Sequence, residues 1–420
     1  MKVLVIGQGG REHALVWKIS QSKKVKKIYA LPGNAGMSDL AETVDIKSSN
    51  IIEIADFAKQ EGIDLTVVGP ELPLSLGVVD EFITHNLKIF GPTQKAATIE
   101  SSKIFAKEFM ARHKIPTAGF QTFNYPDEAQ GHLKNADYPV VVKADGLAGG
   151  KGVFICQDRK VADAAVNTIM VDRKFGRAGE RIIVEEHLTG QEMSFMALSD
   201  GKRVLPMASS MDYKKIHDGD RGPNTGGMGA ISPSPLSGRE LYNTIMNTIV
   251  LPTIEGLQKE GREFRGVLYA GLMITSDGPK VLEYNVRFGD PEIQPIILRL
   301  KSDLVDLLEA VAEGSLFDVP VEWDSRVSGC VVLASKGYPG PYETGKKING
   351  LERAKSLGVE IFHAGTALQD NAIHTAGGRV LNVCALGAHL KDAMKKIYDA
   401  ISFIAYDNIY FRNDIGRVRK

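Results

Sequence analysis

The chain has 420 residues, with 51 acidic and 51 basic side chains, so it is long enough for about three domains and has no overall field to attract nucleic acid or an anionic membrane. Its three cysteines form no C-x-x-C pair, which argues against a zinc site or a disulfide framework and favours a reducing compartment. It begins directly with an apolar strand instead of a signal segment, and no apolar run is long enough to span a bilayer. We therefore expect a cytoplasmic monomer with small-molecule partners and without nucleic-acid or membrane partners.

The first expected element is a strand at Lys2 to Ile6, followed by the turn G-Q-G-G-R-E-H-A-L and a helix. This order begins a doubly wound α/β unit. A dinucleotide site would need a small residue in place of Glu12 and an acidic residue after the next strand, Lys27 to Leu31, so nicotinamide binding is disfavoured. The turn with Arg11 either holds a single phosphate at the helix N-terminus or is purely structural, and the motif alone leaves both open.

Later strand ends of this unit carry further loops. Pro32 to Gly36 follows one strand, and the Gly-Pro pairs at 69–70 and 91–92 follow two more. An open α/β sheet presents its ligand groups at such strand ends. The first domain is therefore expected to hold a ligand, and it is expected to close near residue 100.

The next expected helix runs to about His113, with Ser101 or Ser102 as its cap. Lys103 lies in its first turn, where a cation opposes the helix dipole. This position hints at a ligand for Lys103, although a solvated lysine is the simpler explanation of that fact alone.

Tyr138 to Phe154, Y-P-V-V-V-K-A-D-G-L-A-G-G-K-G-V-F, is expected to form a strand, a glycine-rich loop and a second strand. Glycines let backbone N–H groups approach an anion closely, and lysines add positive charge; the residues concerned are Lys143, Gly146, Gly149, Gly150, Lys151 and Gly152. The loop is not a Walker motif, because a strand and not a helix follows it. The alternative is a hairpin with two solvated lysines, but two residues suffice for a hairpin turn, so we expect a polyphosphate ligand.

A strand at Arg181 to Glu185 leads into E-E-H-L, and two further apolar runs flank the hairpin signal Asp200-Gly201. Backbone groups and carboxylates there could hold an adenine and a ribose, and an edge strand decorated with acids is the alternative. The following segment, Asp212 to Pro233, lacks apolar periodicity and is dense in Gly, Asp, Asn and Pro. We expect an ordered active-site loop there, with a surface Ω-loop as the alternative.

Two strands, Phe264 to Thr275 and Pro279 to Val286, are expected next, and the second leads into E-Y-N-V-R. Strand alternation places Glu283, Asn285 and Arg287 on one face. Carboxylate and amide oxygens suit Mg²⁺ or Mn²⁺, and the arginine could fork onto a phosphate or an oxyanion. A solvated face is the alternative, but the polyphosphate loop in the same chain favours a metal–phosphate site.

The last domain begins near Ser328 and contains expected strands at Gly329 to Ala334 and Arg379 to Leu386. A helix is expected at about Lys391 to Ile404. The glycine-rich stretches at 337–340 and 377–379 have the pattern of turns without chemistry. No task for this domain follows from the pattern.

Four segments together resemble the ATP-grasp superfamily and, within it, the phosphoribosylamine–glycine ligase family: Lys143 to Val153, Glu185 to Glu192, Asp218 to Pro233 and Glu283 to Gln294. The likeness runs nearly end to end, through G-Q-G-G-R-E-H-A-L, P-G-N-A-G, V-G-P-E, K-A-D-G-L-A-G-G-K-G-V, D-G-D-R-G-P-N-T-G-G-M-G-A, E-Y-N-V-R-F-G-D-P-E-I-Q, K-G-Y-P-G and G-G-R-V-L-N-V. It implies a doubly wound N-terminal α/β domain at 1–100, a two-lobed ATP-grasp region at 101–325 with a mobile lid lobe at about 120–190, and a small C-terminal α/β domain at 326–420.

The resemblance implies that ATP drives the joining of glycine to 5-phosphoribosylamine through glycyl phosphate, which gives glycinamide ribonucleotide, ADP and phosphate in the second step of de novo purine synthesis. By that likeness ATP is held by Lys103, Lys143, the loop from Gly146 to Gly152, Glu185, Leu188 and Glu192. Magnesium or manganese is held by Glu283 and Asn285. The candidate contacts of phosphoribosylamine are Gly9, Gly10, Asn34, Gly69, Pro70 and Glu71. Those of glycine and the acyl phosphate are Asp212, Asn224, Thr225, Gly226, Gly227 and Arg287, and the residues implied to be catalytic are Arg287, Asp212 and Lys143.

The chain departs from the family pattern in two places. Where the family commonly reads Asp-His-Lys-Arg, this chain reads Asp212-Tyr213-Lys214-Lys215, so a point charge replaces a forked guanidinium. Many grasp enzymes also carry a metal carboxylate on the strand corresponding to Val267 to Ile274, which has no acid here. A metal ion would therefore depend more on phosphate oxygens.

Two other classes of function compete with this interpretation. Another carboxylate–amine ligase or a carboxylase of the same fold is disfavoured by G-P-N-T-G-G-M-G and by the absence of a biotin-carrier segment. A nucleotide-binding regulator without chemistry would be expected to lack the metal and phosphate residues. Glu283, Asn285, Arg287 and Lys143 are all present.

Overall fold

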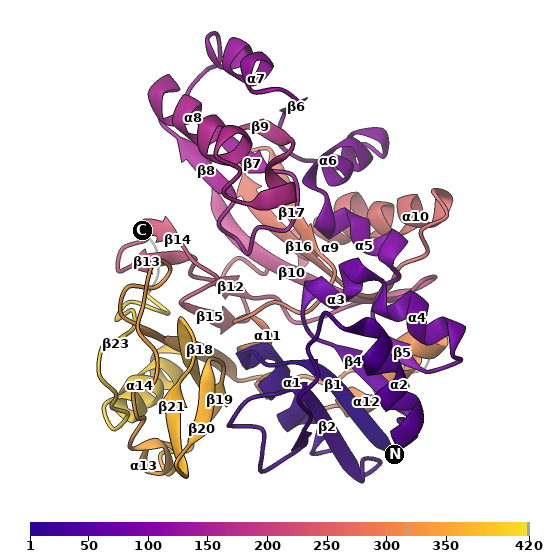
Figure 1. Ribbon diagram of the computed structural model, residues 1–420, viewed down its shortest axis with the longest axis vertical. Coiled ribbons are helices and arrows are strands. Elements are labelled where there is room, and N and C mark those ends of the chain that lie inside the picture. The colour runs from indigo at the N-terminus through magenta and orange to yellow at the C-terminus, as the bar shows by residue number, and fades with distance from the viewer. Residues whose placement is uncertain (317–318, 418–420) are drawn as a thin grey trace.

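The N-terminal domain of the computed structural model is a five-stranded parallel sheet in the order β3-β2-β1-β4-β5 (Figure 1); the structure describes residues 1–316 and 319–417. Strand order reverses at β1, which confirms the expected doubly wound unit. Val3 and Val5 pack into one hydrophobic cluster and Leu4 and Ile6 into another, because helices cover both faces. The elements are β1 (Lys2–Gly7), α1 (Gly10–Ile19), β2 (Lys27–Pro32), β3 (Glu42–Thr43), α2 (Ile51–Glu61), β4 (Leu65–Val68), α3 (Glu71–Leu76), α4 (Val78–Thr84), β5 (Ile89–Phe90) and α5 (Gln94–Ser101).

The lid lobe is a four-stranded antiparallel sheet in the order β6-β9-β7-β8, at the top of Figure 1. It has its own hydrophobic cluster, drawn from residues between Phe123 and Val184. The expected strand, glycine loop and strand are confirmed, with Lys143 opposite Val153. Strand β9 lies between β6 and β7, which contradicts the alternative that this acidic segment is an edge strand. The elements are β6 (Phe120–Phe123), α7 (Pro126–Leu133), β7 (Val140–Ala144), β8 (Val153–Cys156), α8 (Arg159–Val166), a π-helical turn (Asn167–Val171), a 3₁₀ turn (Gly176–Gly179) and β9 (Ile182–Glu186).

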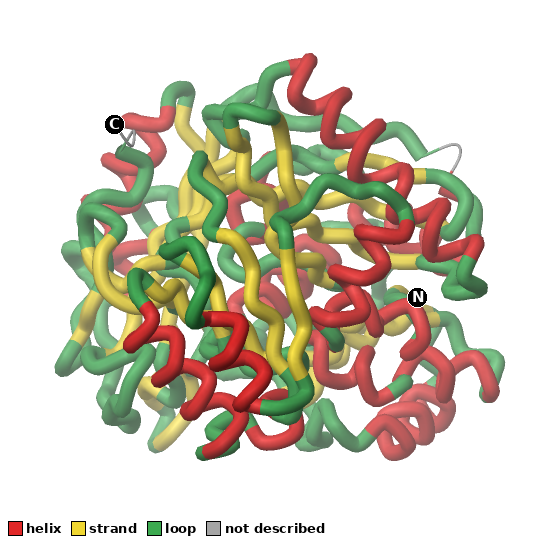
Figure 2. The backbone as a smooth tube through the Cα atoms, turned by 90° about the horizontal axis from the view of Figure 1, so that it is seen from above, coloured by secondary structure: helices red, strands yellow, loops and turns green. Residues whose placement is uncertain are grey.

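The opposing lobe is a second antiparallel sheet in the order β11-β10-β16-β17. Its two hairpins confirm the strand pairs expected around Asp200-Gly201 and Asp277-Gly278. Viewed from above, strands lie toward the middle of the molecule and many helices toward its outside (Figure 2). The elements are α6 (Lys103–Arg112), β10 (Gln191–Asp200), β11 (Val204–Pro206), α9 (Arg239–Ile245), a π-helical turn (Met246–Val250), α10 (Leu251–Lys259), β16 (Arg265–Thr275), β17 (Gly278–Asn285), α11 (Ile293–Arg299) and α12 (Leu304–Glu313).

The C-terminal domain is built on a sheet in the order β12-β15-β18-β22-β19, with β23 also paired to β18. Its hydrophobic cluster lies between this sheet and α14. The elements are β12 (Met211–Asp212), β13 (Lys215–His217), β14 (Arg221–Asn224), β15 (Gly229–Ser232), β18 (Val327–Ser335), α13 (Leu351–Lys355), β19 (Glu360–His363), β20 (Thr366–Gln369), β21 (Ala372–Thr375), β22 (Arg379–Gly387), α14 (Leu390–Ile401) and β23 (Ile409–Tyr410).

The segment Asp212 to Pro233 is ordered, as expected, but it is not a simple loop. Its β13 and β14 form a hairpin, and β12 and β15 extend the C-terminal sheet. Ala230 pairs with Cys330, a hundred residues further along the chain. Pairing over such a distance leaves no local periodicity for a short strand, so the sequence pattern missed it. The segment therefore connects the ATP-grasp region to the C-terminal domain.

Within the described ranges, no helix combines the length and apolar character needed to cross a membrane.

Candidate active site

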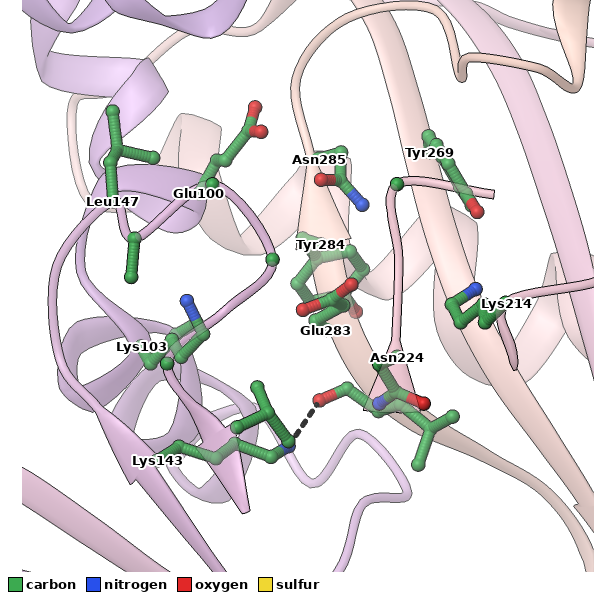
Figure 3. A pocket seen from close by; sticks show the side chains of 18 of the residues that line it. Glu100, Lys103, Lys143, Leu147, Lys214, Asn224, Tyr269, Glu283, Tyr284 and Asn285 are labelled. Atoms are coloured by element: carbon green, nitrogen blue, oxygen red, sulfur yellow. Dashed lines mark hydrogen bonds between the residues drawn. The ribbon is translucent and has the colours of Figure 1, made fainter. Parts of the chain in front are cut away.

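A cavity of about 490 Å³ lies where the lid lobe, the opposing sheet and the two outer domains meet. Figure 3 shows Lys103 and Lys143 on one side of it and Glu283 and Asn285 on the strand that faces them. The sequence-predicted residues that line it are Pro70, Glu71, Lys103, Lys143, Gly149, Gly150, Gly152, Glu185, Leu188, Glu192, Asp212, Asn224, Thr225, Gly226, Glu283, Asn285 and Arg287. These predicted residues lie up to 217 positions apart, from Pro70 to Arg287, and the whole lining extends from Arg11 to Arg379.

Several predicted residues do not line this cavity: Gly9, Gly10, Asn34, Gly69, Gly146, Lys151 and Gly227. Asn34 instead connects two domains, because its amide donates to the carbonyl of Gln8 at 2.8 Å and to that of His363 at 2.9 Å. A Cβ at Gly10 would lie 2.1 Å from the amide nitrogen of Asn382, so this turn packs against the C-terminal domain. Among the N-terminal candidates, the structure places Arg11, Pro70 and Glu71 at the cavity.

The structure also explains why three other predicted residues do not line the cavity. A Cβ at Gly146 would meet Ala178 at 2.8 Å, so this glycine packs the base of the glycine loop against the lid lobe. Lys151 is exposed. Gly227 has a φ of +110°, and a Cβ there would lie 2.3 Å from Pro291. Gly146 and Gly227 therefore shape the segments that carry the lining residues.

Lys103 is the first residue of α6, whose N-terminus is held by an unusual set of contacts. Ser102 caps the helix and donates to the carboxylate of Asp145 at 2.9 Å, and the same carboxylate accepts the N–H of Ile104 at 2.8 Å. Arg181 pairs with Asp145 at 2.6 Å. The Asp145 carboxylate therefore offsets the positive end of the helix dipole. The side chain of Lys103 points into the cavity (Figure 3).

Lys143 is already paired with a carboxylate. Its ammonium lies 2.9 Å from Glu185, and Lys107 lies 2.9 Å from the same side chain. Burial lowers the pKa of Lys107 to about 8, although the Glu185 carboxylate opposes this change. Lys107 also donates to Thr117 at 2.7 Å. Glu185 lines the cavity as expected, but its carboxylate already pairs with two lysines.

Glu283 and Asn285 have the alternation expected on β17, since both are half-buried while Tyr284, Val286 and Phe288 are buried. Burial would raise the pKa of Glu283, but Lys103 and other nearby cations outweigh burial and lower it. Glu283 is therefore an ionised carboxylate beside an amide oxygen. This donor pair fits Mg²⁺ or Mn²⁺.

Glu283 and Asn285 by themselves supply too few ligands for such a metal ion. No group of three or more His, Cys, Asp or Glu side chains with metal-binding geometry occurs in the part of the chain that the structure describes. The amide oxygen of Asn285 accepts from Arg287 at 2.9 Å and has a second lone pair. Phosphate oxygens and water would complete such a site. This agrees with the expectation from the sequence, because β16 has no acidic side chain that could bind the metal.

Arg287 lies just beyond β17 among acidic side chains. It pairs with Glu71 at 3.3 Å and with the buried Glu100 at 3.2 Å. Burial would raise the pKa of Glu71, but Arg287 and Arg11 lower it to about 2. Burial raises the pKa of Glu100. Arg287 thereby links the N-terminal domain to the predicted metal strand.

A second charged group surrounds Asp212. Lys214 lies 2.8 Å from Asp212 and 3.5 Å from Glu192. Burial would lower the pKa of Lys214. Asp212 and the other anionic neighbours of this lysine outweigh burial, so its pKa is raised. Next to this pair, Tyr269 donates to Glu292, whose pKa is raised by burial and by Asp212. Lys214 and Tyr269 approach the cavity from the side opposite Lys103 (Figure 3).

Sequence reasoning missed several lining residues: Glu100, Lys107, Lys214, Tyr269, Asp290, Glu292 and Arg379. Lys107 carried a usable signal, because it lies four residues after Lys103 and therefore on the same helix face. Asp290 and Glu292 lie within the motif recognised around Glu283. Arg379 lies within the matched motif G-G-R-V-L-N-V, but its stretch was interpreted as a turn without chemistry.

Comparison with known proteins gives matches over nearly the whole chain. Residues 1–100 match the N domain of phosphoribosylglycinamide synthetase, residues 101–293 its ATP-grasp (A) domain, and residues 328–418 its C domain. The phosphoribosylamine–glycine ligase of Caldanaerobacter subterraneus subsp. tengcongensis is 52% identical over 416 residues, 99% of each chain. That of Escherichia coli K12 is 50% identical over 420 residues, 99% of this chain and 98% of the relative.

Solved structures agree with these matches. The phosphoribosylamine–glycine ligase of Thermotoga maritima superposes with a TM-score of 0.85 and 32% identity, over 99% of this chain and 100% of that chain. A biotin carboxylase of Campylobacter jejuni has a TM-score of 0.74 at 15% identity, over 97% of this chain and 92% of that chain. At that identity the likeness concerns the fold alone.

Two antiparallel sheet lobes that meet over a cavity lined by lysines and a glycine-rich hairpin define an ATP-grasp ligase. The three matched domains follow one another in the order of one family. The chain belongs to the phosphoribosylglycinamide synthetase family.

Proposed function

We propose that this chain joins glycine to 5-phosphoribosylamine at the expense of ATP, giving glycinamide ribonucleotide, ADP and phosphate in the second step of de novo purine synthesis. The observation that carries this proposal is one cavity in which Lys103, Lys143, Lys214 and Arg287 surround the ionised Glu283. Four cations gathered around one carboxylate suit a metal-bound triphosphate, and the full-length relatives are named for this reaction. The cytoplasmic location and the monomeric state remain predictions.

ATP would lie between the two lobes, with its phosphates near Lys103 and Lys143 and its adenine and ribose near Glu185, Leu188 and Glu192. Because Lys143 is paired with Glu185, binding a phosphate would exchange one anionic partner for another. Lys107 remains with Glu185 after that exchange. The carboxylate is thus not left as an unpaired buried charge, which would be costly.

Glu283 and Asn285 would hold Mg²⁺ or Mn²⁺, which neutralises phosphate charge when it is bound. Arg287, with its own partners at Glu71 and Glu100, would place a fixed positive charge next to that position. Preorganised charge of this kind stabilises the transition state without reorganising during the reaction.

The reaction has two balanced steps. A carboxylate oxygen of glycine attacks the γ-phosphorus, the bond to the bridging oxygen breaks, and ADP leaves. The amine nitrogen of phosphoribosylamine then attacks the acyl carbon, phosphate leaves with one former carboxylate oxygen, and the nitrogen loses a proton. Asp212, Asn224, Thr225, Gly226 and Gly227 are the proposed contacts of glycine and glycyl phosphate, with Asp212, Lys143 and Arg287 as the catalytic side chains.

Phosphoribosylamine would enter from the N-terminal domain. Pro70 and Glu71 line the cavity there, whereas Gly10 and Asn34 pack against the C-terminal domain, and Gly9 and Gly69 pack against Glu12. The glycine loop, with Gly149 at φ +56° and Gly150 at φ +74°, would close over the phosphates and keep water from the acyl phosphate.

A phosphate-release assay tests the proposal. The purified chain is incubated with ATP, a divalent metal and phosphoribosylamine, and glycine is compared with alanine and serine. We expect release with glycine and at most background release with the other two. Equal rates with alanine would contradict the assignment of glycine.

A further inference from the structure

Arg379 brings the C-terminal domain into the cavity. It is the first residue of β22, which pairs along most of its length with β18 at the centre of the C-terminal sheet. Its side chain is 19% exposed and lines the cavity. A rigid strand therefore fixes the base of a long side chain that ends beside the ATP-grasp region.

The guanidinium of Arg379 joins the connecting segment, at Gly226 and Gly227, to the ATP-grasp region, at Asp290. Its Nη1 donates to the carbonyl of Gly226 at 2.6 Å and to that of Asp290 at 2.8 Å, and it lies 3.4 Å from the carbonyl of Gly227. Its Nη2 pairs with the carboxylate of Asp290 at 3.1 Å. Asp290 is fixed in turn by Gln294 at 2.8 Å.

The C-terminal domain holds the peptide groups on both sides of Gly226. The N–H of Gly226 donates to the hydroxyl of Tyr338 at 2.9 Å, and its carbonyl accepts from Arg379. A Cβ at Gly226 would lie 3.2 Å from both of these side chains. The conformation of Asn224 to Gly227 is therefore set by two side chains that lie more than a hundred residues further along the chain.

We propose that Arg379 is a positioning residue for glycine, acting through the peptide groups of Gly226 and Gly227. This inference rests on the proposed function, which places glycine against Asn224 to Gly227. It also gives the C-terminal domain a task, since Arg379 holds the amino-acid side of the site. The nucleotide side is held by Lys103, Lys143 and Glu185, which Arg379 does not contact.

The test compares Arg379→Lys and Arg379→Gln with the unaltered enzyme in glycine and ATP titrations. Lysine keeps the charge but has no planar fork, so it cannot hold two carbonyls and a carboxylate together. We expect the KM for glycine to rise at least about tenfold, as for the loss of hydrogen bonds to a charged group, while the KM for ATP changes by less than about twofold. Tyr338→Phe should raise the KM for glycine by a smaller factor.

Amide hydrogen exchange gives a readout that does not depend on turnover. Exchange of a peptide spanning Asn224 to Met228 should accelerate in Arg379→Lys and stay unchanged in the lid lobe. The matched control is Arg326→Lys, an arginine of the same domain whose side chain is 53% exposed and pairs with Asp324. It should change neither measurement.

An unchanged KM for glycine, a parallel rise of both KM values, or unchanged exchange at Asn224 to Met228 would each overturn the inference. Failure of the proposed function is distinguishable, because the unaltered enzyme would then show no phosphate release that depends on glycine.

Discussion

Lys143 and Glu185 form a buried ion pair at 2.9 Å in the wall of the cavity, and Lys107 pairs with the same carboxylate from the neighbouring helix. Glu185→Gln would leave two lysines near each other without a carboxylate. We expect a loss of about 3 kcal/mol in the free energy of unfolding, which urea titration measures, and a higher KM for ATP.

Glu186→Gln is the matched control for this substitution, because the adjacent side chain is 53% exposed and its ion pair with Lys280 is long, at 3.8 Å. It should change the free energy of unfolding by less than about 1 kcal/mol. Equal effects of the two substitutions would show that the buried pair is not the reason for the loss.

Glu283→Gln keeps the shape of the side chain and removes the charge of the expected metal ligand. We expect the metal-dependent rate of phosphate release to fall at least about 100-fold, because a metal ion contributes several kcal/mol to stabilising phosphoryl charge. The melting temperature should hardly change. Asp277→Asn, at the tip of the same hairpin and 77% exposed, serves as the control. Near-normal turnover of Glu283→Gln would remove Glu283 from the site.

His13 and His363 connect the N-terminal and C-terminal domains as neutral side chains. His13 Nδ1 accepts the backbone N–H of His363 at 2.9 Å, and burial lowers the pKa of His13 to about 3 and that of His363 to about 4. Below about pH 6.5 the unfolded chain binds protons that the folded chain does not, so stability falls as the pH falls.

The slope of the free energy of unfolding against pH checks this arrangement. His13→Asn, which keeps an acceptor, should reduce the slope between about pH 4.5 and 6 by up to about 1.4 kcal/mol per pH unit. The same substitution at the exposed His132 should leave the slope as it is. A slope that is unaffected at His13 would contradict its burial as a neutral group.

Gly146→Ala tests how the glycine loop is held. The new Cβ would lie 2.8 Å from the Cα of Ala178, so the base of the loop has to shift and the KM for ATP should rise severalfold. Gly131→Ala, in α7 and with no atom within 4 Å of the new Cβ, should instead stabilise the lobe by about 0.5–1 kcal/mol. Thermal melting and ATP titration of both variants separate loop closure from lobe stability.

Local patterns were sufficient for the elements with strong periodicity. The doubly wound start, the β7–β8 hairpin and the alternating face of β17 follow from short stretches of sequence and are confirmed. Short strands such as β12 and β15 were missed, because they exist only through partners far along the chain. Gly10 and Asn34 could not be placed either, since their contacts are with another domain.

The same limit applies to the charges of the site. Side chains of the matched motifs could be expected near a phosphate, but the pairing of Lys143 with Glu185, and of Arg287 with Glu71 and Glu100, depends on distances between separate elements. Burial also decides which of these groups stays charged, and the extent of burial cannot be predicted from a local sequence pattern.

Oxygen transfer from glycine to phosphate tests the central claim most directly, because activation of the carboxylate by ATP requires that one of its oxygens leaves with the phosphate. Glycine labelled with ¹⁸O in its carboxylate is turned over with ATP and phosphoribosylamine, and the released phosphate is analysed by mass spectrometry. We predict one ¹⁸O atom in each phosphate. Unlabelled phosphate, formed together with the product, would contradict the acyl phosphate and with it the proposed role of this cavity.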